Sequence, residues 1–172
     1  MVAVAPAVAP AVERAWDAVR GVLDPEVPVL SVVDLGIVRD IIFAGDAVTV
    51  RVTPTYSGCP ALRVIENDIV DALHAAGFTD ARVETVYQPA WTTDWISVEG
   101  RSRLREYGIA PPGPRAADST ELVPLLRSVP TLECPFCSSR RTERKSEFGS
   151  TACKALWFCN GCHQPFEEFK AI

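Results

Sequence analysis

The sequence lacks the features of a secreted or membrane-spanning protein. No apolar run is long enough to cross a bilayer. The first ten residues are rich in Ala, Val and Pro, but no basic residue precedes the apolar stretch, and Pro6 and Pro10 interrupt it. We therefore expect a cytoplasmic protein that has no membrane partner.

The sequence also lacks the residue sets that define several classes of enzyme. It contains no Ser-His-Asp set, no Cys-His pair with matching loops and no glycine-rich phosphate loop. These absences disfavour hydrolases and nucleotide-driven enzymes. The net charge of −5 and the pI of about 5.1 give no overall basic surface, so we expect no nucleic-acid partner.

The 172 residues, 48% of them apolar, suffice for one ordinary domain and a smaller one. Apolar residues recur every three or four positions in some segments and alternate in others. These periods predict helices over 13–23, 60–76 and 97–108, the last capped by Ser97, and strands over 37–43, 47–53 and 81–87. The order α-β-β-α-β-α predicts an α+β domain in which helices pack on a small mixed sheet.

Composition divides the chain into four parts. We expect a flexible N-terminus over 1–12, the α+β domain over 13–108 and a stiff proline-rich linker over 109–130. Residues 131–172 are too few to fold around an apolar core alone. The strands predicted in this last part cover 141–146, 155–158 and 166–169.

The last part contains two Cys-x-x-Cys pairs, Cys134 with Cys137 and Cys159 with Cys162, separated by 21 residues. Tetrahedral zinc takes four soft ligands, and two such pairs brought together by a hairpin supply them. Without a secretion signal, the pattern favours a metal over two disulfides or free thiols. We therefore predict a small zinc-ribbon β domain with a structural Zn²⁺, in which His163 is a neighbour of the site and not a ligand.

Two cysteines remain, and Cys59 lies where a predicted strand is followed by a predicted helix. Pro60 fits the first helical position, where its missing N–H costs nothing, and this would place Cys59 at the N-cap. A thiol there faces unpaired backbone N–H groups and the positive end of the helix dipole, which favours the thiolate. The alternative is a small buried residue that fills a turn. Cys153 is a spare ligand, a partner for Cys59 or a buried residue.

Three acidic residues, Asp24, Glu26 and Asp34, lie in loops that enter the predicted sheet. They can form turns and helix caps, or they can act on a metal or a thiol. If they approach Cys59, they would oppose the helix dipole and keep the thiol protonated until a metal arrives. An iron–sulfur cluster usually needs four protein thiolates, so two spare cysteines suit transient carriage. A stable cluster would need a homodimer or a client protein.

Two groups of motifs resemble known families. The first resembles the small domain that SufT shares with cytosolic iron–sulfur assembly factors, and it consists of Asp24-Pro25-Glu26-Val27-Pro28-Val29, Asp34-Leu35-Gly36-Ile37-Val38, and Thr53 with Cys59-Pro60. The second narrows the resemblance to the PaaD family, the D proteins of bacterial phenylacetate degradation, and it consists of Trp91–Ser97, Tyr107–Pro112 and Gly149–Leu156. The resemblance covers nearly the whole chain from Trp16 onward.

The resemblance implies an accessory protein of the phenylacetyl-CoA 1,2-epoxidase system, a multicomponent oxygenase that adds oxygen to the aromatic ring. It implies a non-catalytic factor that assists assembly or maturation of the iron–sulfur or diiron centres of the oxygenase and reductase components. By the same resemblance, Cys59 is the reactive or iron-binding residue, and Asp24, Glu26 and Thr53 line its pocket. A transient iron ion or iron–sulfur cluster is then the cargo.

Three other functions stay open. A structural subunit could bridge oxygenase and reductase through the ribbon and the loop of Trp91 and Trp95, although core packing is the commoner role of such residues. A thiol enzyme could use Cys59 and Cys153 as a redox pair. Nucleic-acid binding by the ribbon is disfavoured, because six Lys and Arg stand against five Asp and Glu there and four thiolates on Zn²⁺ would add −2.

Overall fold

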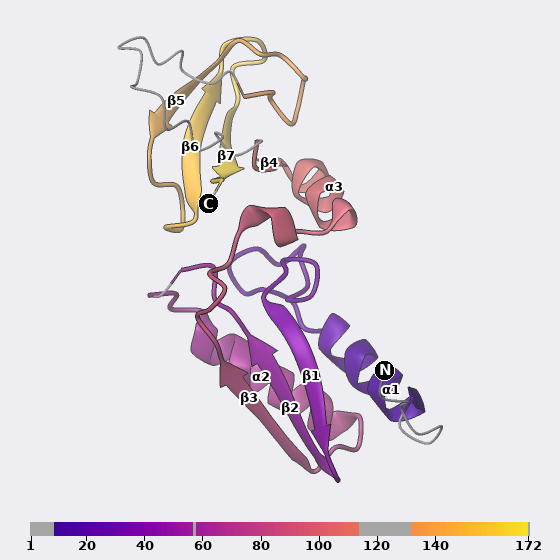
Figure 1. Cartoon of the computed structure of the whole chain (residues 1–172). Coiled ribbons are helices and arrows are strands. Elements are labelled where there is room, and N and C mark those ends of the chain that lie inside the picture. The colour runs from indigo at the N-terminus through magenta and orange to yellow at the C-terminus, as the bar shows by residue number, and fades with distance from the viewer. Residues whose placement is uncertain (1–8, 57, 114–131, 172) are drawn as a thin grey trace. The chain divides into compact units, whose positions relative to one another are not determined.

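The computed structural model describes residues 9–56, 58–113 and 132–171 (Figure 1). The contacts within it divide the chain into two compact units, Met1–Gly100 and Arg101–Ile172, which we call unit 1 and unit 2.

Unit 1 is built on a three-stranded sheet of order β1-β2-β3. Strands β1 (Val38–Ala44) and β2 (Ala47–Val52) form the predicted hairpin and pair antiparallel. Strand β3 (Asp80–Thr85) lies parallel to β2, so the sheet is mixed, as predicted. Parallel neighbours need a crossover connection, and helix α2 supplies it (Figure 1). All three strands begin and end within two residues of their predicted positions.

Helix α2 (Leu62–Ala75) packs one face on the sheet. Ile65, Ile69 and Leu73 recur every four residues on that face and are fully buried. The alternating valines of β2, Val48, Val50 and Val52, are fully buried as well. Burying one such side chain contributes roughly 1.5–3 kcal/mol, so these two rows form the main core of unit 1.

Helix α1 (Ala9–Arg20) begins and ends earlier than the helix predicted over 13–23. It ends at Gly21, whose backbone N–H bonds back to the carbonyl of Ala18 at 3.2 Å. The helix therefore stops before Asp24-Pro25, although a proline can end a helix at the residue before it. It also starts inside the segment expected to be flexible, of which residues 1–8 lie outside the described part of the chain.

The loop that carries two tryptophans packs onto unit 1. Trp91 is only 3% exposed, and its indole N–H donates to the Leu35 carbonyl at 3.0 Å. The loop continues through the single-turn helix η1 (Thr93–Trp95). Gly36 has a φ of 75°, and a Cβ on it would lie 2.6 Å from Trp95 Cβ, so only glycine fits this close approach.

Ser97 caps helix α3 (Val98–Tyr107), as predicted, because its Oγ accepts a hydrogen bond from the Gly100 N–H at 2.8 Å. The same Ser97 Oγ donates to Asp34 Oδ1 at 2.9 Å. Asp34 also accepts from the Ser31 hydroxyl at 2.8 Å. Of the two roles that the sequence left open for Asp34, the structure shows the turn and cap role.

Unit 2 contains a four-stranded sheet of order β4-β7-β6-β5 (Figure 1). Strands β5 (Thr142–Ser146), β6 (Lys154–Cys159) and β7 (Pro165–Phe169) pair antiparallel, close to the three predicted ribbon strands. Strand β4 (Ile109–Ala110) joins β7 in parallel. The sequence assigned these two apolar residues to the linker, but they are buried on the sheet edge. The remaining linker, 114–130, lies outside the described residues.

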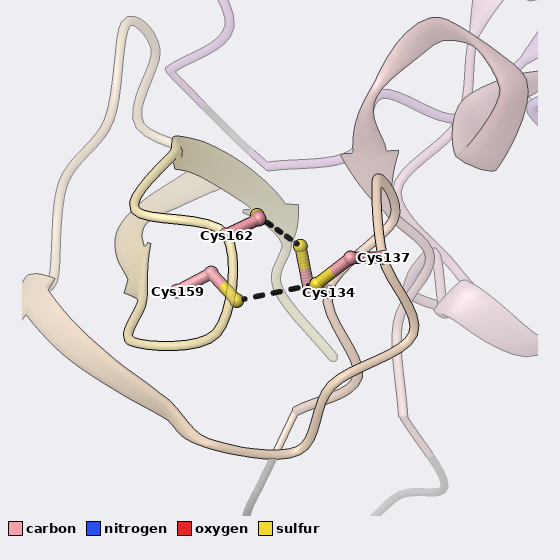
Figure 2. Close-up of side chains that lie close together, drawn as sticks. All are labelled: Cys134, Cys137, Cys159 and Cys162. Carbon is pink, nitrogen blue, oxygen red and sulfur yellow. Dashed lines mark hydrogen bonds between the residues drawn. The ribbon is translucent and has the colours of Figure 1, made fainter.

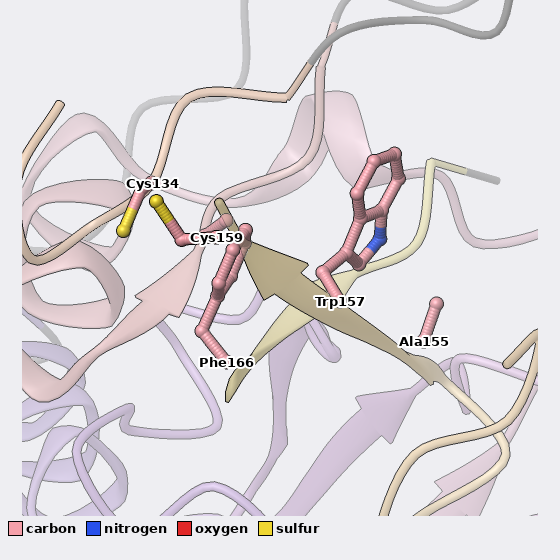
Figure 3. Packing of buried hydrophobic residues seen from close by; sticks show 6 residues of the cluster. Cys134, Ala155, Trp157, Cys159 and Phe166 are labelled. Atoms are coloured by element: carbon pink, nitrogen blue, oxygen red, sulfur yellow. The ribbon is translucent and has the colours of Figure 1, made fainter. Parts of the chain in front are cut away.

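The core of unit 2 is small and merges with the cysteine cluster. Trp157 of β6 and Phe166 of β7 stack with ring centroids 6.4 Å apart (Figure 3). The other buried members of this core are Ala110, Cys134, Ala155 and Cys159. Two members of this core are cysteines of the predicted zinc site. The apolar contacts and any metal bound there therefore both stabilise unit 2.

Candidate functional site

The four predicted zinc ligands of unit 2 lie together (Figure 2). The sulfurs of Cys134 and Cys162 are 3.8 Å apart, those of Cys137 and Cys159 are 3.6 Å apart, and all four lie within 4.8 Å of one another. A tetrahedral zinc with Zn–S bonds of about 2.3 Å holds its sulfurs about 3.8 Å apart. The donor set and its spacing therefore fit a closed, structural zinc site, as predicted.

Both Cys-x-x-Cys pairs fold into the same turn. The backbone N–H of Ser138 donates to the Cys134 carbonyl at 2.9 Å, and the N–H of His163 donates to the Cys159 carbonyl at 2.9 Å. Ser138 and His163 also share a left-handed backbone, with φ of 57° and 60°. Two copies of one local turn thus present two thiols each, and the β5–β6 hairpin brings the copies together.

His163 does not belong to the group of metal-binding side chains found in the described residues. Its ring lies 6.4 Å from the Phe158 ring, centroid to centroid. Gly161 is required in the same turn, because a Cβ on it would lie 2.8 Å from the Ser139 side chain. Its backbone N–H instead reaches the Cys159 sulfur at 3.3 Å.

The thiols of this cluster differ in acidity. Burial raises the pKa of Cys159, but the backbone N–H groups of Cys162 and Gly161 and the neighbouring thiols lower it to about 6. Burial and the adjacent sulfurs raise the pKa of Cys162 to about 12. A metal that binds here must therefore displace protons, which makes its affinity depend on pH.

Cys59 lies in the connection from β2 to α2, but not at the N-cap. Helix α2 begins at Leu62, and its N-cap is Ala61, so Cys59 stands two residues before the predicted position. The prediction of Pro60 as the first helical residue is wrong, because Pro60 and Ala61 form a separate turn closed by the Leu62 N–H on the Cys59 carbonyl at 3.3 Å. The N–H groups of Ala61 and Leu62 nevertheless hydrogen-bond to the thiol.

The electrostatics of Cys59 oppose the prediction of a favoured thiolate. Burial raises its pKa most, the two backbone N–H groups lower it, and the charges of Glu26 and Asp24 raise it again. The pKa therefore lies above its ordinary value, and the thiol is protonated at neutral pH. The same result agrees with the second expectation, that acidic residues near Cys59 keep the thiol protonated.

Asp24 combines both roles that the sequence left open. Its buried carboxylate accepts hydrogen bonds from the backbone N–H groups of Glu26 at 2.9 Å and Val27 at 2.8 Å, so it forms a turn. Its negative charge also acts on Cys59, together with that of Glu26. The structure thus brings Asp24 and Glu26 into electrostatic contact with the thiol.

Thr53 follows the last residue of β2, six positions before Cys59 in the same connection. Its side chain is 1% exposed, and its Oγ1 has no hydrogen-bond partner among the described residues. A buried hydroxyl without a partner costs about 1–3 kcal/mol. Such a cost is typical of a position where a ligand or water supplies the missing bond.

Cys153 is buried in unit 2, and its sulfur lies 3.0 Å from the Thr151 hydroxyl. It is not part of the four-sulfur cluster, so the spare-ligand interpretation fails. Sequence reasoning missed the role of the next residue, Lys154, which is 4% exposed and pairs with Glu167 at 3.2 Å. Gly149 allows the close approach, since a Cβ there would lie 2.5 Å from Glu167 Oε1.

Two observations bear on the other predicted partners. Trp91 is buried and Trp95 is half-buried, with the Arg39 guanidinium 3.4 Å above its ring centroid, so the proposed bridging loop is not a pair of exposed anchors. No helix within the described residues is long and apolar enough to span a membrane.

Two family models match the chain. Residues 12–85 match the family described as iron-sulfur cluster assembly protein, and residues 118–170 match the PaaD zinc beta ribbon domain. The order of the matches agrees with the α+β domain and ribbon predicted from the sequence.

Individual proteins give the same division. A protein of Escherichia coli strain K12, named as a component of 1,2-phenylacetyl-CoA epoxidase, is 44% identical over 95% of this chain and 94% of its own length. An Fe-S protein maturation auxiliary factor of Porphyromonas gingivalis is 33% identical over 49% of this chain and 82% of its own. A crystallised domain of unknown function from Bacillus anthracis, 24% identical over 54% of this chain and 90% of its own, shares the fold with a TM-score of 0.51.

Proposed function

The chain belongs to the PaaD family of the phenylacetyl-CoA epoxidase system, and from this membership we propose that it assists assembly or maturation of the metal centres in that system. The proposed clients are the oxygenase and reductase components, and the proposed cargo is iron or an iron–sulfur cluster. The chain itself is proposed to have no catalytic step on phenylacetyl-CoA. The observation that carries this proposal is one thiol, Cys59, set between backbone N–H groups and two carboxylates.

The charges around Cys59 support a thiol that waits for a cation. The negative charges of Asp24 and Glu26 disfavour a free thiolate, and the same charges attract Fe²⁺. When the ion binds, the S–H proton leaves to solvent and a sulfur–iron bond forms. Thr53 Oγ1, which lacks a partner among the described residues, is proposed to complete the site.

The number of ligands supports transient carriage. Cys59 is the only cysteine among residues 1–100, whereas a stable iron–sulfur cluster usually takes four thiolates. A second chain or the client would therefore supply the remaining thiolates of a bound cluster. In unit 2, by contrast, we assign Zn²⁺ as a permanent structural ion held by Cys134, Cys137, Cys159 and Cys162.

The test is anaerobic reconstitution of the epoxidase components with this protein, in which iron and sulfide of the clients are measured. The Cys59→Ser variant should leave the clients with less iron than the wild type, because the only thiol of unit 1 is gone. Cys153→Ser serves as the matched control and should support normal loading, since Cys153 lies outside both sites. Equal client iron with wild type and Cys59→Ser would reject the proposal.

A further inference from the structure

Helices α1 and α2 of unit 1 pack together and leave a shallow, open groove of about 550 Å³ beside them. The residues that line it recur at one-turn spacing, and half of them are Ala or Gly: Ala18, Gly21, Val22, Leu23, Asp68, Asp71, Ala72 and Ala75. Leu23 is 50% exposed there. None of the lining residues belongs to the Cys59 site or to the zinc site, so the groove is a separate surface.

The carboxylates of Asp68 and Asp71 line the α2 side of the groove. No described residue forms an ion pair with either one or donates a hydrogen bond to it. Other carboxylates of the two helices are paired, as where Arg20 binds Asp17 at 2.7 Å and Arg63 binds Glu66 at 3.4 Å. The negative charge of these helices that has no ion pair among the described residues includes the two carboxylates at the groove.

This pair is unfavourable within the free protein. Like charges three positions apart stand on neighbouring turns of a helix and repel each other. Two cationic groups brought from outside would relieve this repulsion, and no described residue supplies them. The groove is therefore complementary in charge to a basic partner.

The walls of the groove favour a helical partner. Backbone groups within α1 and α2 are already hydrogen-bonded inside each helix, so an extended peptide would find no backbone partners there. A helix satisfies its own backbone and can approach closely over alanine and glycine. We propose that this groove docks a helix of a partner protein, which carries two Arg or Lys residues one turn apart beside a face of small apolar side chains.

The inference rests on the proposed function only for the identity of the partner, a component of the epoxidase system. The test is photo-crosslinking in cells that express the full chain together with the epoxidase components. In one variant, Leu23→p-benzoylphenylalanine places the photoreactive group in the groove. In the control, Tyr87→p-benzoylphenylalanine places it on a residue that is 54% exposed and does not line the groove.

Irradiation should cross-link the Leu23 variant, but not the Tyr87 variant, to a helix that carries the basic pair. Mass spectrometry of the cross-linked peptide identifies this helix. Adding Asp68→Lys and Asp71→Lys should lower the yield by about tenfold, because both attractions become repulsions. Adding Asp46→Lys and Glu99→Lys instead changes the net charge equally outside the groove and should leave the yield unchanged. Each variant should unfold at the same temperature as the wild type, which confirms that the variant is folded.

Each outcome decides the proposal. The absence of a groove-specific cross-link, a cross-linked segment without the basic pair, or a yield that charge reversal leaves unchanged would overturn it. A basic helix from a protein outside the epoxidase system would support the groove and count against the proposed partners. Loss of client iron in Cys59→Ser is measured separately and does not depend on the groove.

Discussion

The two units use cysteine in opposite ways. Unit 2 holds four sulfurs within 4.8 Å of one another, on two copies of one turn. Unit 1 holds a single thiol, Cys59. The charges of Glu26 and Asp24 act on this thiol, whereas the neighbours of each clustered thiol in unit 2 are other sulfurs. A closed set of four thiolates keeps a metal permanently, whereas one thiol can bind an ion and release it. The number of neighbouring sulfurs thus separates a structural site from a candidate transfer site.

Charge separates the units as well. Residues 1–100 contain 14 Asp and Glu against 6 Arg, a net charge of −8, whereas residues 101–172 contain 8 Asp and Glu against 11 Lys and Arg, a net charge of +3. The thiol that is proposed to meet Fe²⁺ belongs to the acidic unit. Acidic surroundings raise the local concentration of cations and steer them inward.

Removing the metal of unit 2 should give the largest effect. We expect a strong chelator, or Cys134→Ser, to unfold unit 2, because structural zinc contributes about 10–16 kcal/mol in zinc-finger peptides at pH 7. Hydrogen exchange should show lost protection in β5–β7 and unchanged protection in β1–β3. Metal analysis should find zinc in the wild type and in Cys153→Ser. Loss of protection in both sheets would show that the units do not fold independently.

A core substitution in unit 1 should have an intermediate effect that is confined to that unit. Ile69→Ala removes a fully buried side chain of α2 and should lower the free energy of unfolding by about 2–5 kcal/mol. Urea unfolding measures this change, and zinc content should stay constant. Val64→Ala on the same helix is the control, because Val64 is exposed and should change stability by about 0.5 kcal/mol or less. If zinc were lost together with unit 1, the independence of the units would be refuted.

Neutralising one acid beside Cys59 should give the smallest effect. Because the charge of Glu26 raises the pKa of Cys59, Glu26→Gln should lower this pKa and speed alkylation at pH 7 by about two- to threefold. Alkylation rates against pH, measured with zinc bound and in a Cys153→Ser background, report this thiol alone.

The sign of the pH dependence follows from the raised pKa. The folded state holds the Cys59 proton more tightly than the unfolded state, so this group's contribution to stability is complete below the unfolded pKa. It is lost as pH rises toward the folded pKa. A thiol that titrates below the ordinary cysteine value of about 8.5 would contradict the structure.

Much of the fold follows from local patterns. The strands of unit 1 and the faces of α2 appear in the periodicity of the sequence, because these periods arise within single elements. The end of α1 was mispredicted, since Gly21 closes that helix before Pro25 can break it. Strand β4 was missed, because two residues carry no period and pair only with β7, far along the chain.

The candidate sites show the same difference between local features and features that depend on remote residues. The cluster of four cysteines was predicted in full, since each Cys-x-x-Cys turn is local. The start of α2 and the favoured thiolate of Cys59 were mispredicted. The first depends on the turn at Pro60, and the second depends on burial and on charges more than thirty residues earlier. The burial of Lys154 against Glu167 was missed for a similar reason, since strands β6 and β7 bring the two together.

The sequence by itself determined the four cysteines of the cluster, the order of helices and strands in the first unit, and the single thiol of that unit, because each is a matter of residue type and short spacing. Only the tertiary structure decided that burial, together with the charges of Glu26 and Asp24, raises the pKa of this thiol. It also decided that Trp91 is buried and that two carboxylates beside the α1–α2 groove have no counterion among the described residues. These properties depend on distances between segments that are remote in the chain, and electrostatic energy and burial are set by those distances.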